Sequence, residues 1–179
     1  MKTYVVELYA MGSMSMSPTL IAPSKSASEV LQPDRVVVNK WIYRISDPKR
    51  GDIVIFKTNN PQDGTPVNFT KRVVGLPGET IDIESSYVLI NGERLTAPPI
   101  FAKIVSQQDG FTGYCTFQEL GVRNAGVPLP LTLGTDEYFV MGDNPHSFDS
   151  RFLGPVLRQS ITGKVIRIFY PFDRIREIE

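Results

Sequence analysis

Apolar residues occur along this chain in short runs between polar segments, a pattern typical of a β-rich domain. The runs are rich in β-branched and aromatic residues, and prolines and glycines separate them. Helical periodicity is weak, so we expect at most a turn or two of helix, at 18–20 or 26–31. The pattern predicts strands over 4–9, 35–44, 52–57, 68–74, 80–83, 87–90, 93–96, 137–141 and 164–170.

Two tight reversals follow from turn chemistry. Asn91-Gly92 separates two apolar runs, and this dipeptide favours a type I′ hairpin because both residues tolerate positive φ. The segment 76–79 reads Leu-Pro-Gly-Glu, with Pro second and Gly third as a type II turn requires. Both reversals support a fold built from antiparallel β-strands.

Two stretches have the composition of insertions. Segment 21–28 is small and polar, and segment 106–134 is rich in Gly, Gln, Pro and Thr. We therefore predict a mainly β protein whose antiparallel β-sheets form a core over 1–85 and 136–179. A small β-rich lobe is expected to be inserted at 86–135.

Composition excludes several classes of function. The 179 residues include 41% hydrophobic residues, and 19 basic residues balance 19 acidic ones. Disorder and coiled coil are excluded, and bulk charge gives no reason to expect nucleic acid as a partner. One Cys and one His cannot form an internal disulfide or a four-ligand zinc site, so we expect no metal and no cofactor. No apolar run approaches the roughly 18–20 residues of a membrane span, so the chain as given is expected to lack an anchor.

The candidate chemistry begins with Ser15 in a serine-rich segment. A serine hydroxyl needs a base to act as a nucleophile, and the sequence offers His146 or a lysine. Lys71 lies in a strand-like run and shares its face with Phe69 and Val73. Holding half of its amine neutral at pH 7 requires a pKa shift of about 3.4 units, which full burial can supply. The alternative is that Lys71 extends to solvent while Arg72 points outward.

Four motifs occur together in a fixed order. They are Ser-Met-x-Pro-Thr-Leu from Ser15, Gly-Asp-Ile-Val-Ile-Phe at 51–56, Lys-Arg-Val-Val-Gly-Leu-Pro-Gly-Glu at 71–79, and Gly-Asp-Asn followed by Ser-Phe-Asp-Ser-Arg at 142–151. In order and spacing they resemble type I signal peptidases over 8–90 and 136–170. The resemblance implies a signal-peptidase-like catalytic β core. It also implies a serine endopeptidase that uses a Ser–Lys dyad to remove signal peptides from exported preproteins after small residues (A-x-A-like).

The resemblance also implies a role for each site residue. Ser15 corresponds to the nucleophile and Lys71 to the general base, while the hydroxyl of Ser13 contributes to the oxyanion hole. Ser147 corresponds to the serine that orients the lysine, although the loop before it is one residue shorter than usual.

The remaining positions of the motifs carry supporting roles. Asp149 and Arg151 correspond to an ion pair that supports the site, and they could equally be an ordinary local pair. Ser13 is a second candidate nucleophile because Gly12-Ser13-Met14 imitates the start of the motif. We assign His146 a loop role.

Substrate and location follow from the same resemblance. In an extended peptide, residues two apart point to one side, so both small side chains of the cleavage site would face one shallow surface. Candidates for its lining are Tyr9, Met11, Leu20 and Thr70, each of which could instead be ordinary core. The enzyme would act at the outward face of the cell membrane, with Trp41 or Tyr43 on the lipid surface.

Two other classes of function are also compatible with the sequence. One is a related Ser–Lys peptidase of the pilus-maturation or self-cleaving-repressor type, although no helix-turn-helix pattern is present to support a repressor. The other is a catalytically inactive β-rich module that binds exported peptides. Cleavage of a signal-like peptide distinguishes the module from an enzyme.

Overall fold

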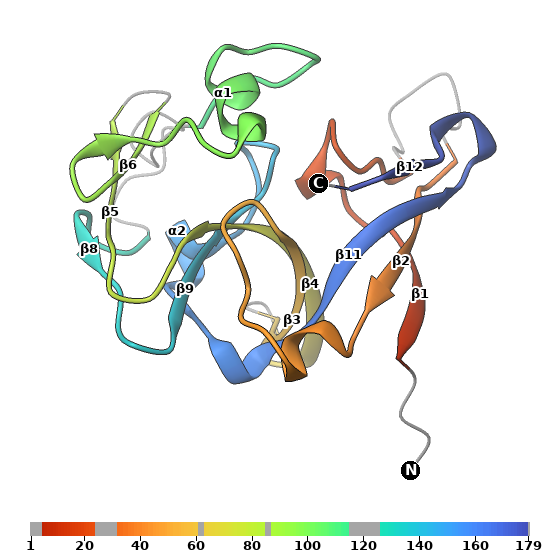
Figure 1. Ribbon diagram of the computed structural model, residues 1–179, viewed down its shortest axis with the longest axis horizontal. Helices are drawn as coiled ribbons and strands as arrows, with labels where there is room; N and C mark the ends of the chain where they lie inside the picture. The colour runs from red at the N-terminus through yellow and green to blue at the C-terminus, as the bar shows by residue number, and fades with distance from the viewer. Residues whose placement is uncertain (1–4, 24–31, 61–62, 85–86, 115–125, 179) are drawn as a thin grey trace.

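The computed structural model describes residues 5–23, 32–60, 63–84, 87–114 and 126–178, and within these the chain forms two antiparallel sheets (Figure 1). The strand order of the first sheet is β1-β2-β11-β3-β4-β9-β10, with β12 paired to β11. The order of the second is β7-β6-β5-β8. The prediction of a mainly β, antiparallel fold is confirmed.

The bounds of the elements are as follows. The first sheet contains β1 (Val6–Ala10), β2 (Arg35–Asn39), β3 (Ile53–Asn59), β4 (Pro66–Gly75), β9 (Glu137–Met141), β10 (Val156–Leu157), β11 (Ile161–Tyr170) and β12 (Arg176–Glu177). The second contains β5 (Thr80–Glu84), β6 (Tyr87–Ile90), β7 (Glu93–Arg94) and β8 (Leu131–Thr132). The helices are α1 (Pro99–Val105) and α2 (Ser150–Leu153), with 3-10 turns η1 (Met14–Met16), η2 (Ile42–Arg44), η3 (Arg158–Ser160) and η4 (Phe172–Arg174).

The central strand β3 is buried on both faces. Ile53 and Ile55 pack into one hydrophobic cluster with η1, β2 and β11, whereas Val54 and Phe56 pack into a second with β4 and β9. Because side chains alternate between the faces of a strand, apolar residues at successive positions require a core on each side of the sheet. This arrangement holds β4 firmly beside β3, at the centre of the molecule.

The second sheet lies apart from β1 and β2, with α1 beside it (Figure 1). Its core joins Ile81 of β5 and Phe101 and Ile104 of α1 to Phe139 of β9. Strand β9 therefore connects the two sheets. The predicted inserted lobe over 86–135 remains a prediction.

The predicted strand over 35–44 was too long, since β2 ends at Asn39. The side-chain Oδ1 of Asn39 accepts hydrogen bonds from the backbone N–H groups of Trp41 (2.9 Å) and Ile42 (3.0 Å), which turns the chain into η2. Tyr43 in η2 is buried and its hydroxyl donates to Asp52, so the prediction that Tyr43 contacts lipid was wrong.

The helix predictions also need correction. Residues 18–20 form no helix, and the nearest helical turn is η1. The other candidate, 26–31, lies outside the described residues. Helix α1 was not predicted, although it begins at Pro99, a position that proline favours. The short strands β8, β10 and β12 were not predicted either.

The two predicted reversals are present. Asn91 and Gly92 both have positive φ, 52° and 84°, as a type I′ turn requires. Gly78 has φ 79°, and the N–H of Glu79 donates to the carbonyl of Leu76.

Among the residues described, no helix is both long and apolar enough to cross a membrane.

Candidate active site

The segment that carries Ser15 is held at both ends by one buried residue, Asp34. After β1, the N–H of Met11 donates to the carbonyl of Asp34 (2.9 Å), and the N–H of Ile21 donates to the Asp34 side chain (2.8 Å). Asp34 is fully buried and forms an ion pair with Arg174 (2.8 Å). Between these anchors the chain makes the short turn η1, with Ser15 as its middle residue.

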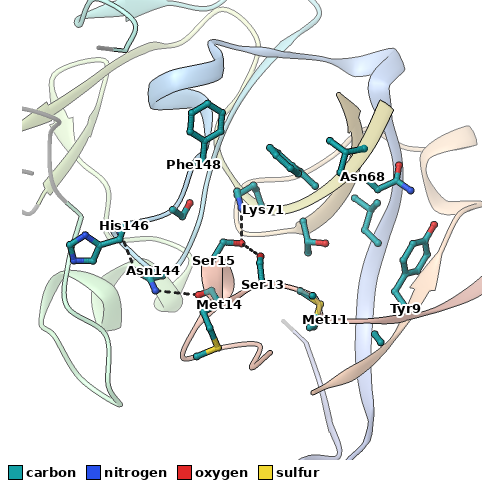
Figure 2. Close-up of a pocket in the computed structure, with 17 residues that line it drawn as sticks. Tyr9, Met11, Ser13, Met14, Ser15, Asn68, Lys71, Asn144, His146 and Phe148 are labelled. Atoms are coloured by element: carbon teal, nitrogen blue, oxygen red, sulfur yellow. Dashed lines mark hydrogen bonds between the residues drawn. The ribbon is translucent and has the colours of Figure 1, made fainter. Parts of the chain in front are cut away.

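Lys71 reaches Ser15 from β4. Its Nζ lies 2.7 Å from Ser15 Oγ, and the lysine is only 3% exposed (Figure 2). Burial lowers the pKa of Lys71 from 10.5 to about 8, the negative charges of Asp149 and Asp143 oppose this effect, and Arg151 adds to it. About one-tenth of the amine is therefore neutral at pH 7, some 300-fold more than for an ordinary lysine.

This arrangement can transfer a proton. A neutral amine accepts the hydroxyl proton of Ser15 over the observed distance, which makes the oxygen nucleophilic. The alternative in which Lys71 extends to solvent was wrong. The centroid of the Phe69 ring lies 5.4 Å from Nζ.

Ser13 lies directly before η1. Its hydroxyl is exposed and donates to Ser15 Oγ at 3.1 Å. The N–H groups at the start of a helical turn have no partner within that turn, and Ser15 is the second residue of η1. A hydroxyl and a backbone N–H are thus available close to the Ser15 oxygen.

The loop after β9 fixes the backbone of η1. The N–H of Asn144 donates to the Ser15 carbonyl (3.1 Å), and its side-chain amide donates to the Met14 carbonyl (3.2 Å). Gly142 lies so close that a Cβ there would come within 2.2 Å of Ser147 Oγ and 2.4 Å of the Ser15 carbonyl oxygen. Only glycine allows this approach.

Asp149 is the acceptor at the centre of the same loop. It is fully buried and accepts from Ser147 Oγ (2.6 Å), the N–H of Gly142 (3.0 Å) and Arg151 Nε (2.9 Å). Arg151, also buried, donates in addition to the Pro145 carbonyl (2.8 Å). Asp149 and Arg151 therefore form an ion pair that shapes the loop.

Ser147 lies in the wall of the cleft with Lys71, but its hydroxyl is directed to Asp149. Among the described residues, no hydrogen bond joins Ser147 to Lys71. Its expected role in orienting the lysine stays a prediction. The charge of Asp149, which raises the Lys71 pKa, links this loop to the amine electrostatically.

The sequence did not reveal a second buried ion pair, between Arg72 and Asp143. Arg72 donates through Nε (2.8 Å) and Nη2 (2.6 Å) to the two oxygens of Asp143, and through Nη1 to the carbonyl of Gly51 (2.7 Å). Thr19 also donates to Asp143 (2.5 Å). Arg72 is 1% exposed, so the alternative in which it points outward was wrong. Both residues lie in the recognised motifs, but no local pattern pairs them.

A cleft of about 650 Å³ opens at the dyad. Three of the four residues proposed to bind substrate line it: Tyr9, Met11 and Thr70. Leu20 does not, because it is fully buried in the core beneath η1 with Met16. The prediction that Leu20 contacts substrate is therefore not supported by its position. Asn68 and Asn144, which the sequence reasoning did not select, also line the cleft.

His146 is exposed on the loop after β9, and its ring points away from Ser15 and Lys71 (Figure 2). Its backbone N–H donates to the Asn144 side chain. Within the described ranges, no group of three or more His, Cys, Asp or Glu residues is arranged to hold a metal ion.

Comparison of the sequence with known proteins finds a family model and relatives that all carry the name signal peptidase. The sequence model of the family described as "Signal peptidase, peptidase S26" matches residues 1–170. Signal peptidase I of Bacillus amyloliquefaciens is 34% identical over 88% of this chain and 80% of its own length. Signal peptidase I of Leptolyngbya laminosa is 35% identical over 99% of this chain and 75% of its own.

Among solved structures, a signal peptidase I from Enterococcus faecalis V583 is 31% identical. It aligns over 67% of this chain and 97% of its own, with a TM-score of 0.47. On the match to the family model and the identity to these relatives, the chain belongs to the signal peptidase family, peptidase S26.

Proposed function

We propose that this serine peptidase removes signal peptides from exported preproteins with Ser15 as nucleophile and Lys71 as general base. The observation that carries the proposal is the 2.7 Å approach of a buried amine to a serine oxygen in the wall of a cleft. Neutral Lys71 takes the hydroxyl proton as Ser15 Oγ attacks the scissile carbonyl. The resulting ammonium gives that proton to the leaving amine, and the same lysine then activates the water that hydrolyses the acyl-enzyme.

The oxyanion of the tetrahedral intermediate is stabilised by the Ser15 N–H and the Ser13 hydroxyl. Support comes from the position of Ser13, whose exposed hydroxyl lies 3.1 Å from Ser15 Oγ. One donor of this kind is worth about 2.7–4 kcal/mol in comparable sites. Loss of Ser13 should therefore slow cleavage without abolishing it.

The part of the preprotein before the scissile bond binds as an added strand. The half of β4 from 66 to 70 pairs with β3 alone in the described part of the chain, since β9 pairs only from Arg72 onward. This free edge faces the cleft together with the segment that follows β1. An extended peptide there turns alternate side chains toward the wall that includes Met11 and Thr70, which supports selection of small residues at the first and third positions before the bond.

The membrane is the natural place for this reaction, because the apolar segment of a signal peptide resides there. Val6 and Leu8 of β1, which leads to the nucleophile, are 46% and 63% exposed, Val5 just before it is 51% exposed, and Trp41 is 43% exposed. We place this surface against lipid on the outward face of the cell membrane. Flotation with anionic liposomes tests the placement, and a chain that stays entirely at the bottom of the gradient contradicts it.

The proposed chemistry is tested with a synthetic signal-like peptide that carries one A-x-A site. Mass spectrometry should locate a single cut after the second alanine. Ser15→Ala and Lys71→Ala should each abolish it, while Lys57→Ala, which removes an exposed lysine from the neighbouring strand, should not. Cleavage that persists in Lys71→Ala contradicts the assigned base, and cleavage that persists in Ser15→Ala but is lost in Ser13→Ala identifies Ser13 as the nucleophile.

A further inference from the structure

A second cavity lies beside the active-site cleft. Its volume is about 460 Å³, and Asn144 and His146 line both cavities. The remaining lining comes from Ser17, just after η1, from Gly110 and Thr112, and from Asp143 and Pro145 of the loop. The two cavities therefore meet at the loop that carries Asn144.

The order of residues across the dyad indicates which part of the substrate reaches the second cavity. Figure 2 shows Tyr9 and Asn68 on one side of Ser15 and Lys71, and Asn144 and His146 on the other. The strand edge that can pair with an extended peptide lies on the Asn68 side. If residues before the scissile bond occupy that edge, as the proposed function requires, the residues after the bond pass Asn144 toward His146.

Because side chains of an extended peptide alternate in direction, only some residues after the bond face the second cavity. The first and third side chains before the bond face the protein, and the next side chain on that same side belongs to the second residue after the bond. A small side chain fits the wall before the bond. The side chain after it meets a cavity of about 460 Å³ instead of a shallow wall.

The lining of the second cavity is suited to a polar side chain. The hydroxyls of Ser17 and Thr112 and the imidazole of His146 make no hydrogen bond to any described protein residue. They come from three different segments and offer both donors and acceptors. By contrast, the carboxylate of Asp143 is already paired with Arg72, and the Asn144 side chain is bonded to Met14.

We propose that this second cavity binds the side chain of the second residue after the scissile bond, and that it prefers a long polar side chain such as glutamine or glutamate. His146 and Thr112 are the residues that determine the preference. The inference rests on the proposed function, because it takes the direction of the bound preprotein from it. It assigns His146 a role in selecting the mature end of the substrate, away from the proton transfer.

The test compares two signal-like peptides that differ only at this position, one with glutamine and one with leucine of similar size. The wild-type protein should cleave the glutamine peptide with a kcat/KM about threefold to tenfold higher, the range expected for one or two hydrogen bonds. His146→Ala and Thr112→Val should each reduce this ratio toward one while still cleaving the leucine peptide, which shows that the variants are folded. Asn68→Ala, which alters only the first cleft, should keep the ratio.

The outcomes separate the two proposals. Cleavage of both peptides with a wild-type ratio near one overturns this inference alone. A ratio that survives in both His146→Ala and Thr112→Val also overturns it. No cut in any signal-like peptide overturns the proposed function, and this inference with it.

Discussion

Replacing the buried lysine by methionine should stabilise the protein while abolishing its activity. The pKa of Lys71 falls from 10.5 to about 8 on burial. At 1.36 kcal/mol for each pKa unit, this corresponds to about 3.4 kcal/mol of unfavourable free energy for the charged amine in the folded state. Methionine preserves the buried stem without the charge, so Lys71→Met should raise the free energy of unfolding by up to about 3 kcal/mol at pH 7.

The gain should depend on pH in a defined direction. Because the pKa is lower in the folded state, the unfolded wild-type chain binds more protons between about pH 8 and 10.5, and its stability rises with pH across that window. The advantage of Lys71→Met is therefore full below about pH 8 and shrinks toward pH 10.5. Active sites commonly contain groups such as this that lower the stability of the folded protein but are needed for activity.

Denaturant unfolding at pH 7 and pH 10 measures both effects. Lys57→Met is the matched control, since Lys57 is exposed on the adjacent strand β3 and should change stability by less than about 0.5 kcal/mol. The reasoning is refuted if Lys71→Met is no more stable than wild type at pH 7, or if the difference between them is the same at both pH values.

The geometry of the site also determines how activity and stability respond to pH and to mutation. The kcat/KM of the wild type should rise about tenfold per pH unit below pH 8 and level off above it, because only the neutral amine of Lys71 accepts the proton; a flat profile from pH 6 to 8 would count against this. Gly142→Ala should lower the melting temperature and reduce cleavage more than tenfold because its Cβ would displace the Ser15 carbonyl, whereas Gly12→Ala, whose Cβ would meet no described residue within 4 Å, should keep the wild-type melting temperature; equal melting temperatures of the two variants would contradict the packing argument. Arg72→Met should cost about 3–5 kcal/mol in denaturant unfolding by leaving Asp143 charged and unpaired, and adding Asp143→Leu should recover most of it; additive losses would show that the pair itself is the source of stability.

The sequence was sufficient where a signal is local. Short runs of β-branched and aromatic residues located β3, β4 and β9, and positive φ at Asn91 and Gly92 follows from residue types that tolerate it. The Ser15 and Lys71 motifs were likewise readable, and the structure brings the two side chains within bonding distance. Each of these features depends on a few neighbouring residues.

It was insufficient where the outcome depends on a distant partner. Nothing near Arg72 shows that Asp143, 71 positions away, neutralises it, and this long-range pair is what buries it. Leu20 looks like a lining residue by its position near Ser15, but the bend after η1 turns it into the core. The strand over 35–44 was overextended because the capping bonds of the Asn39 side chain outweigh the apolar pattern that follows.

The most direct test is the titration of the Lys71 amine itself. With ¹³C-labelled lysine, an NMR pH titration follows the side-chain carbon next to each amine, and the signal missing from Lys71→Met identifies Lys71. A midpoint near pH 8, well below those of the exposed lysines, is the predicted result. A midpoint above pH 10, together with those of the other lysines, would contradict the assignment of Lys71 as the base for Ser15.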